Sequence, residues 1–136
     1  MNIKPITAKY AVSEQISPDD FSTIFEAGYK TVICNRPDME NPPFLYAEEM
    51  AKAAEAAGIA FQNFPLTHQT MTPDNIAKQF EMVDAADGPV LAYCASGTRC
   101  CVVWALSQVG KKSADEILQQ AENAGYDLRA MRGALG

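Results

Sequence analysis

A cysteine and an arginine stand close together where an apolar segment runs into an apolar helix pattern. The stretch VLAYCASGTRCCVVWAL covers residues 90–106 and contains Cys94 and Arg99. A thiolate is a nucleophile, and a guanidinium fork binds tetrahedral oxyanions through parallel hydrogen bonds. The stretch therefore predicts group transfer through a covalent bond to Cys94, with Arg99 holding the anionic group.

The loop between these two residues has the composition of an anion-binding turn. Its members are Ala95, Ser96, Gly97 and Thr98. A chain that turns here from strand into helix points backbone N–H groups inward, and the helix N-terminus adds partial positive charge. Such surroundings lower the pKa of a thiol. We expect residues 95–99 to form an anion-binding loop around a Cys94 thiolate.

The other cysteines, Cys34, Cys100 and Cys101, have apolar neighbours. Cys100 and Cys101 lie in a predicted helix, where core packing is the ordinary role of a cysteine and a redox role is the alternative. Cys100 could also border the pocket. Cys34 lies in a predicted strand and could face Cys94 across the sheet end as a resolving thiol. Adjacent cysteines in an ordinary globular composition argue against a disulfide framework and favour a reduced, cytoplasmic setting.

His68, the only histidine, and Asp38, in the segment NRPD, are candidate catalytic acids. Histidine titrates near neutral pH and could protonate a leaving group if its loop reaches Cys94. The alternatives are a surface loop residue for His68 and a turn residue bonded to local backbone for Asp38. Arg36 adds positive charge to the pocket or lies in solvent. One histidine and no cysteine pair with zinc spacing predict no metal site, and no motif indicates a cofactor.

Sequence patterns typical of strands and helices alternate along the chain. The elements that they predict must position the candidate site residues. Strands are predicted at 9–15, 30–35, 59–65 and 89–93. Helices are predicted at 17–28, 46–58, 72–83, 98–109, 113–124 and 127–133. This alternation predicts an α/β fold with a central, mostly parallel sheet flanked by helices. Ligands bind at the carboxyl ends of strands in such sheets, and Cys94 follows one of these ends directly.

The whole chain sets further bounds on function. Its 136 residues predict a single domain spanning 1–136, and its formal net charge is -6. With no basic stripe to contact phosphates, nucleic acid is excluded as a partner. A small anionic substrate needs a local positive site. No apolar run reaches about 18 residues, and the first residues lack a signal-peptide pattern. We expect a cytoplasmic protein without a membrane segment, and the oligomeric state stays open.

Four segments carry a resemblance to a known family: VSEQISPDDF, GYKTVICNRPD, FPLTHQTMTPDNI and GPVLAYCASGTR. Over nearly its whole length the chain resembles the family called beta-lactamase hydrolase-like protein, phosphatase-like domain. VICNRP is also similar to the smaller dual-specificity phosphatases. The resemblance implies a tyrosine- or dual-specificity-phosphatase-like fold and phosphocysteine chemistry. Cys94 would attack phosphorus, Arg99 and the loop amides would hold the phosphoryl oxygens, and water would release phosphate.

The loop departs from the phosphatase pattern at four points. Phosphatases of this superfamily have five residues between cysteine and arginine, and this chain has four. Tyr93 stands where histidine is usual, Cys100 stands where serine or threonine is usual, and residues 65–68 contain no aspartate acid. YCASGTR instead resembles the rhodanese pattern cysteine-x-x-glycine-x-arginine, often preceded by tyrosine. That resemblance implies sulfane sulfur carried as a persulfide on Cys94.

Three functions therefore stay open. The first is a phosphatase-like hydrolase acting through a covalent Cys94 intermediate, which the chain-wide resemblance favours. The second is a persulfide or thiosulfate sulfurtransferase, which the loop favours, and some relatives of the family are described as sulfurtransferases. The third is a non-catalytic anion-binding module, against which the intact Cys94 and Arg99 count. The partner in each case is a small anion, either a phosphoester or a sulfane-sulfur donor.

Overall fold

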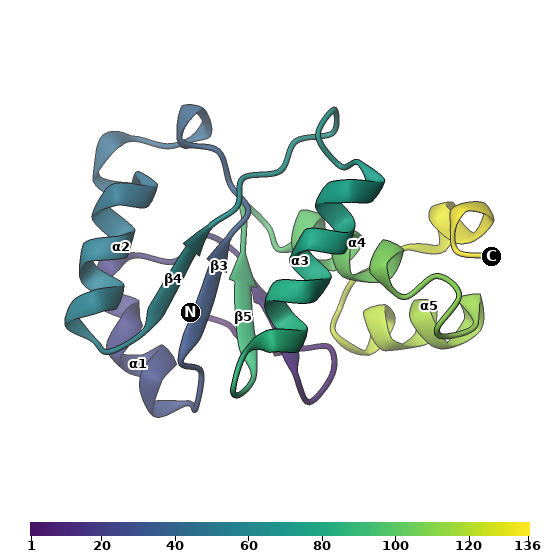
Figure 1. Cartoon of the computed structure of the whole chain (residues 1–136), viewed down its shortest axis with the longest axis horizontal. Helices are drawn as coiled ribbons and strands as arrows, with labels where there is room; N and C mark the ends of the chain where they lie inside the picture. Colours follow the sequence, from purple (N-terminus) through teal and green to yellow (C-terminus); the bar gives the residue numbers. More distant parts are fainter.

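The computed structural model describes residues 1–136 and places a five-stranded sheet between two helical layers (Figure 1). The strands are β1 (Lys4–Pro5), β2 (Tyr10–Ser13), β3 (Thr31–Cys34), β4 (Ala60–Asn63) and β5 (Val90–Tyr93). Their order is β1-β2-β5-β3-β4, and every pairing is parallel except that of β1 with β2. The predicted α/β fold with a mostly parallel sheet is confirmed.

The helices divide between the two faces of the sheet. They are α1 (Phe21–Glu26), α2 (Ala47–Ala56), α3 (Pro73–Ala85), α4 (Thr98–Ser107) and α5 (Ala114–Asn123). Figure 1 shows α1 and α2 on one side of the sheet and α3, α4 and α5 on the other. Side chains alternate along β5, so that Leu91 and Tyr93 enter the cluster with α1 and α2, whereas Val90 and Ala92 face the other layer.

Two helix starts carry polar capping side chains. The Thr72 hydroxyl accepts a hydrogen bond from the backbone N–H of Asn75 at 3.3 Å, at the start of α3. Ser113 and Glu116 form a capping box at the start of α5. These side chains satisfy N–H groups that the first turn of a helix leaves without partners.

Two predicted elements differ from those observed, and one observed strand was not predicted. The strand β1 has only two residues, too short for an alternating pattern, and the sequence did not predict it. The predicted helix at 17–28 begins with a 3-10 turn, Pro18–Asp20, before α1. The last predicted helix, 127–133, is instead a 3-10 segment at Arg129–Ala134. None of the helices combines the length and the apolar character needed to cross a membrane.

The sheet brings four strand ends to one edge. Ser13 pairs with Tyr93, Tyr93 with Cys34 and Cys34 with Asn63, so β2, β5, β3 and β4 end in register. The segments that follow these strands meet at this edge. The edge therefore collects loops from widely separated parts of the sequence, as expected for a parallel sheet.

Candidate active site

The loop after β5 is anchored to the neighbouring strand end. The backbone N–H of Cys94 donates to the carbonyl of Ser13 at 3.4 Å, and that of Gln15 donates to the carbonyl of Ala95 at 3.3 Å. Cys94 is 1% exposed. The loop thus continues the parallel pairing of β2 and β5 beyond the sheet and holds the cysteine at its base.

Gly97 makes the turn from this loop into α4. Its φ is 90°, in the left-handed region that other residues rarely adopt. A Cβ atom here would overlap the hydroxyl of Tyr126. That hydroxyl donates to the carbonyl of Ser96 at 3.0 Å and accepts from Lys4 Nζ at 3.3 Å. The turn therefore needs glycine for its backbone angle and for the close approach of Tyr126.

The loop stabilises the thiolate form of Cys94. Gly97 N–H donates to Cys94 Sγ at 3.1 Å. Hydrogen bonding from the Cys100 thiol, together with the backbone N–H groups of Cys100, Gly97 and Ser96, outweighs burial and lowers the pKa of Cys94 to about 5. A thiol with this pKa is ionised at neutral pH and is a competent nucleophile.

The remaining cysteines have raised pKa values and stay protonated at neutral pH. Burial raises the pKa of Cys100 and raises that of Cys101 to about 12. Burial also raises the pKa of Cys34, whose Sγ donates to the carbonyl of Arg36 at 3.3 Å. Cys34 belongs to the cluster with α1 and α2, and Cys94 belongs to the cluster on the opposite face. Both cysteines are free thiols, and they pack on opposite faces of the sheet.

The guanidinium of Arg99 lies over the ends of the strands. Its Nη1 donates to the carbonyls of Leu66 at 2.9 Å and Asn35 at 3.3 Å. Nη1 and Nη2 also donate to the two carboxylate oxygens of Glu40, at 3.2 and 3.0 Å. The carbonyls of Leu66 and Asn35 therefore fix the position of Arg99. Its two terminal nitrogens bind the Glu40 carboxylate in the way they would bind another anion.

Glu40 is a site residue that the sequence did not predict. Burial would raise its pKa, but hydrogen bonds and charge attraction from Arg99 and Arg36 lower it. Arg36 donates from Nε to Glu40 Oε1 at 3.3 Å and from Nη2 to the Glu40 carbonyl at 2.9 Å. Arg36 therefore holds Glu40 at the cleft and does not line the cleft itself. No sequence motif marks Glu40, because its partner Arg99 is 59 residues away.

A cleft of about 740 Å³ opens at this edge and unites most of the predicted site. The cysteine loop, Arg99 and Glu40 line it, and His68 enters from the turn at 67–70. Its remaining wall comes from Met71, α4 and the C-terminal segment. Cys94, Arg99 and His68 thus share one cleft, as their candidate roles require.

Asp38 does not line the cleft, and its carboxylate is bonded to nearby backbone, which is the alternative that the sequence left open. Its Oδ1 accepts the backbone N–H of Ala47 at 2.8 Å, at the first residue of α2. A carboxylate at this position stabilises a helix N-terminus. Tyr93 also points away, because its ring packs on the opposite face at 6.5 Å from that of Phe61.

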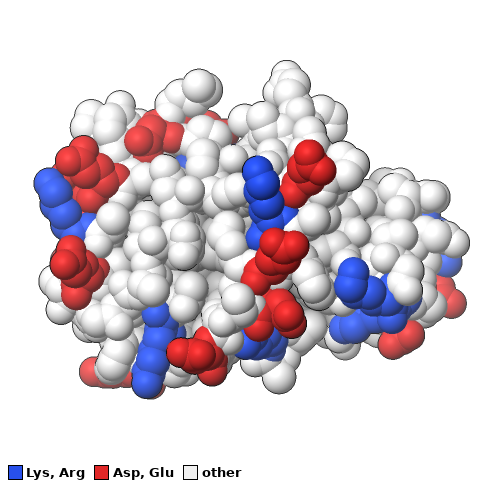
Figure 2. Space-filling view, in the orientation of Figure 1, with Lys and Arg blue, Asp and Glu red and all other residues white.

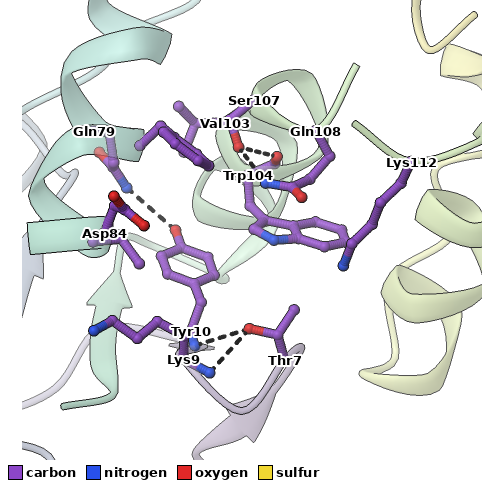
Figure 3. Close-up of a pocket in the computed structure, with 12 residues that line it drawn as sticks. Thr7, Lys9, Tyr10, Gln79, Asp84, Val103, Trp104, Ser107, Gln108 and Lys112 are labelled. Atoms are coloured by element: carbon purple, nitrogen blue, oxygen red, sulfur yellow. Dashed lines mark hydrogen bonds between the residues drawn. The ribbon is translucent and has the colours of Figure 1, made fainter. Parts of the chain in front are cut away.

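A buried polar network lies behind Arg99. Asn35 and Gln79 exchange two side-chain hydrogen bonds, at 2.7 and 3.0 Å. Gln79 also donates to the hydroxyl of Tyr10 at 3.2 Å, and this hydroxyl donates to the carbonyl of Cys100 at 2.8 Å. Figure 3 shows Gln79 reaching Tyr10 beside a second cavity of about 230 Å³ between α3 and α4. The network joins the Asn35 backbone, which holds Arg99, to the helix that follows the cysteine loop.

Charged side chains of both signs are distributed over the surface. Figure 2 shows basic and acidic side chains interspersed on the face in view, without a continuous basic stripe. No group of three histidine, cysteine or acidic side chains is placed to hold a metal ion. The positive charge of the cleft is local and comes from Arg99.

Comparisons with known proteins identify the family of the chain. Residues 2–111 match the family described as beta-lactamase hydrolase-like protein, phosphatase-like domain. A beta-lactamase hydrolase-like protein of Xylella fastidiosa is 32% identical over 130 residues, which are 94% of this chain and 30% of that protein. One from Agrobacterium fabrum is 29% identical over 127 residues, 92% of this chain and 30% of that protein. The chain thus spans about 30% of the length of these curated relatives.

Solved structures show the same fold. A proposed phosphatase from Neisseria meningitidis superposes with a TM-score of 0.86 at 32% identity, over 99% of this chain and 96% of that one. Pseudomonas aeruginosa TpbA, solved in complex with pTyr, has a TM-score of 0.70 at 16% identity, over 98% and 80% of the two chains. The fold is that of the tyrosine and dual-specificity phosphatases, and the chain belongs to the beta-lactamase hydrolase-like protein, phosphatase-like domain family.

Proposed function

We propose that this protein is a cysteine-dependent phosphatase that hydrolyses phosphomonoesters through a covalent phosphocysteine on Cys94. The observation that carries the proposal is the thiolate at the base of the cleft. Cys94 Sγ accepts the Gly97 N–H at 3.1 Å, and Arg99 lines the same cleft. Nucleophile and anion-binding groups therefore come from one loop.

The first chemical step forms the phosphocysteine. The phosphoryl oxygens displace the Glu40 carboxylate, which accepts hydrogen bonds from the fork of Arg99 at 3.0 and 3.2 Å. The Cys94 thiolate attacks phosphorus, the S–P bond forms, and the bond from phosphorus to the ester oxygen breaks. Protonated His68, which lines the cleft, gives its proton to the leaving oxygen.

The second step releases phosphate. Neutral His68 accepts a proton from water as the water oxygen attacks phosphorus. The S–P bond breaks, and its electron pair returns to Cys94 as thiolate. The loop N–H groups and the Cys100 thiol that lower the pKa of Cys94 to about 5 also make this thiolate a good leaving group.

Turnover of an aryl phosphate tests the proposal. We expect Cys94→Ser to abolish phosphate release, because the serine hydroxyl is protonated at neutral pH. The matched control is Cys34→Ser, which changes a buried thiol of the opposite face and leaves turnover within about twofold of the original protein. Phosphate release that persists in the Cys94→Ser protein would contradict the covalent mechanism.

A persulfide sulfurtransferase is the second candidate, supported by the four-residue spacing between Cys94 and Arg99. In that reaction the Cys94 thiolate accepts a sulfane sulfur from thiosulfate, and sulfite leaves. The same purified protein incubated with thiosulfate or glutathione persulfide would then gain one sulfur atom on Cys94, seen by intact-protein mass spectrometry. Turnover of aryl phosphate without sulfur uptake favours the phosphatase, and the reverse favours the sulfurtransferase. A protein inert in both assays that binds sulfate through Arg99 is the non-catalytic module.

A further inference from the structure

One side of α4 is apolar, packs against the border of the core and is only partly buried. The buried side of this helix carries Cys100, Cys101 and Trp104. Val102 and Leu106 lie four residues apart on another side, are only partly buried, and line the cleft. Together with Thr98 they form a row along one helix face. This row runs from the cysteine loop for about 12 Å, at 1.5 Å per residue.

Residues from two other segments complete an apolar wall beside this row. Met71 lies just before α3, and Met131 and Ala134 belong to the C-terminal 3-10 segment. We call the five residues Met71, Val102, Leu106, Met131 and Ala134 the apolar wall. No phenylalanine, tyrosine or tryptophan lines the cleft. Methionine and aliphatic side chains adapt their shape to flexible chains, whereas a flat aromatic ligand is ordinarily held by stacking on other rings.

The charges of the cleft match a single phosphoryl group. Arg99 is the only arginine in the lining, no lysine lines the cleft, and Glu40 carries the opposite charge. His68 is the one other side chain of the lining that can carry positive charge, and the proposed mechanism places its proton on the leaving oxygen. A substrate with several phosphate groups would need a further cation for each of them. The space beyond Arg99 is instead bounded by the apolar wall, where a second phosphate would lose its hydration without a partner.

We propose that the substrate of this site is the phosphate monoester of an apolar, chain-like alcohol. The phosphoryl group lies on the Cys94 loop, and the alkyl chain lies along Val102 and Leu106. This inference rests on the proposed phosphatase activity. It adds the class of the leaving group, which the nucleophile and its anion-binding loop do not specify.

A series of alkyl phosphates tests the proposal directly. Butyl, hexyl and octyl phosphate, kept below micellar concentrations, are compared with glycerol 3-phosphate by release of inorganic phosphate. Each methylene group buried on the apolar wall is expected to raise kcat/KM roughly two- to fourfold. Octyl phosphate then exceeds butyl phosphate by at least about tenfold. Equal values for all four compounds would refute the proposal.

Substitution of apolar-wall residues by polar residues of similar shape tests whether the dependence of kcat/KM on chain length arises at this wall. Val102→Thr and Met131→Gln are expected to flatten the dependence on chain length, because they lower kcat/KM for octyl phosphate more than for glycerol 3-phosphate. Val109→Thr is the matched control, because Val109 is exposed and lies outside this cleft. A chain-length dependence that survives both wall variants contradicts the assigned position of the chain.

A binding measurement separates this proposal from the proposed activity. Calorimetric titration of the Cys94→Ser protein with the same alkyl phosphates gives affinities that need no turnover. Affinity that rises with chain length supports the apolar wall even if the original protein releases no phosphate, in which case only the phosphatase proposal fails. Affinity independent of chain length overturns the substrate class even if aryl phosphate is hydrolysed.

Discussion

The thiolate of Cys94 depends on a neighbour that is itself a cysteine. Cys100 is fully buried, and hydrogen bonding from its thiol is the main reason that the pKa of Cys94 is lowered to about 5. The resemblance to phosphatases implies a hydroxyl at this position. Here the Cys100 thiol, a weaker donor than a hydroxyl, is sufficient to stabilise the Cys94 thiolate. The helix N-terminus and the loop N–H groups also point at the same sulfur.

Removal of this donor should be visible in the pH dependence of Cys94 alkylation. We expect the rate with iodoacetamide to rise with pH through a midpoint near 5 in the original protein. Cys100→Ala should move that midpoint upward, toward the ordinary value of about 8.5, because the thiolate loses its main donor. The rate at pH 6 should then fall about tenfold.

Two further variants identify the cause of that shift. Cys100→Ser keeps a donor and should give a midpoint below that of Cys100→Ala. Cys101→Ala removes the adjacent buried thiol, which makes no hydrogen bond to Cys94, and should leave the midpoint in place. A midpoint that is the same in Cys100→Ala and the original protein would remove Cys100 from the site.

At the scale of elements, the loop between β5 and α4 is the part that the sequence specifies most completely. Its glycine, its small residues and the arginine after it were sufficient to predict an anion-binding turn. The contact of Tyr126 with this loop could not be predicted from the sequence. Tyr126 follows α5, about 30 residues after the loop, and comes next to it only in the folded chain. The fold places Lys4 of β1 against the same hydroxyl.

Gly97→Ala should destabilise the protein far more than alanine at another glycine of similar backbone angle. Gly110 has φ 84° and no atom within 4 Å of the place that a Cβ would take, so Gly110→Ala measures the backbone strain alone, about 1 kcal/mol. At Gly97 the overlap with Tyr126 adds to that strain, and we expect a loss of at least about 3 kcal/mol in urea unfolding. Tyr126→Phe in the Gly97→Ala background should recover part of the loss, and equal losses at both glycines would contradict the close approach.

The other site residues also divide into those that the sequence identifies by residue type and those that only long-range contacts define. His68 and Arg99 were found because their residue types carry chemistry wherever they lie. Asp38 does not line the cleft. A carboxylate after a strand can equally cap a helix, and its partner Ala47 lies nine residues further on. Glu40 was missed, since it is defined only by its long-range pairing with Arg99.

At the scale of the whole molecule, alternating patterns predicted the layers, but they gave no information about polar groups inside them. Asn35 is fully buried and Gln79 is 3% exposed. Both lie in segments that read as ordinary strand and helix. Their hydrogen bonds connect β3, α3 and β2. The Asn35 carbonyl also accepts a hydrogen bond from Arg99 Nη1 at 3.3 Å. The position of the arginine is therefore set by packing across the whole core.

Gln79→Leu should therefore weaken both the fold and the site. Leucine leaves Asn35 Oδ1 buried without its donor, and such a group costs about 1–3 kcal/mol. We expect urea unfolding to show this loss and kcat/KM for aryl phosphate to fall, because the backbone that holds Arg99 is less fixed. Gln119→Leu, on the exposed face of α5, is the matched control and should change stability by less than about 0.5 kcal/mol. Loss of stability with unchanged kcat/KM at a temperature where the variant is fully folded would show that the network supports the core alone and does not position Arg99.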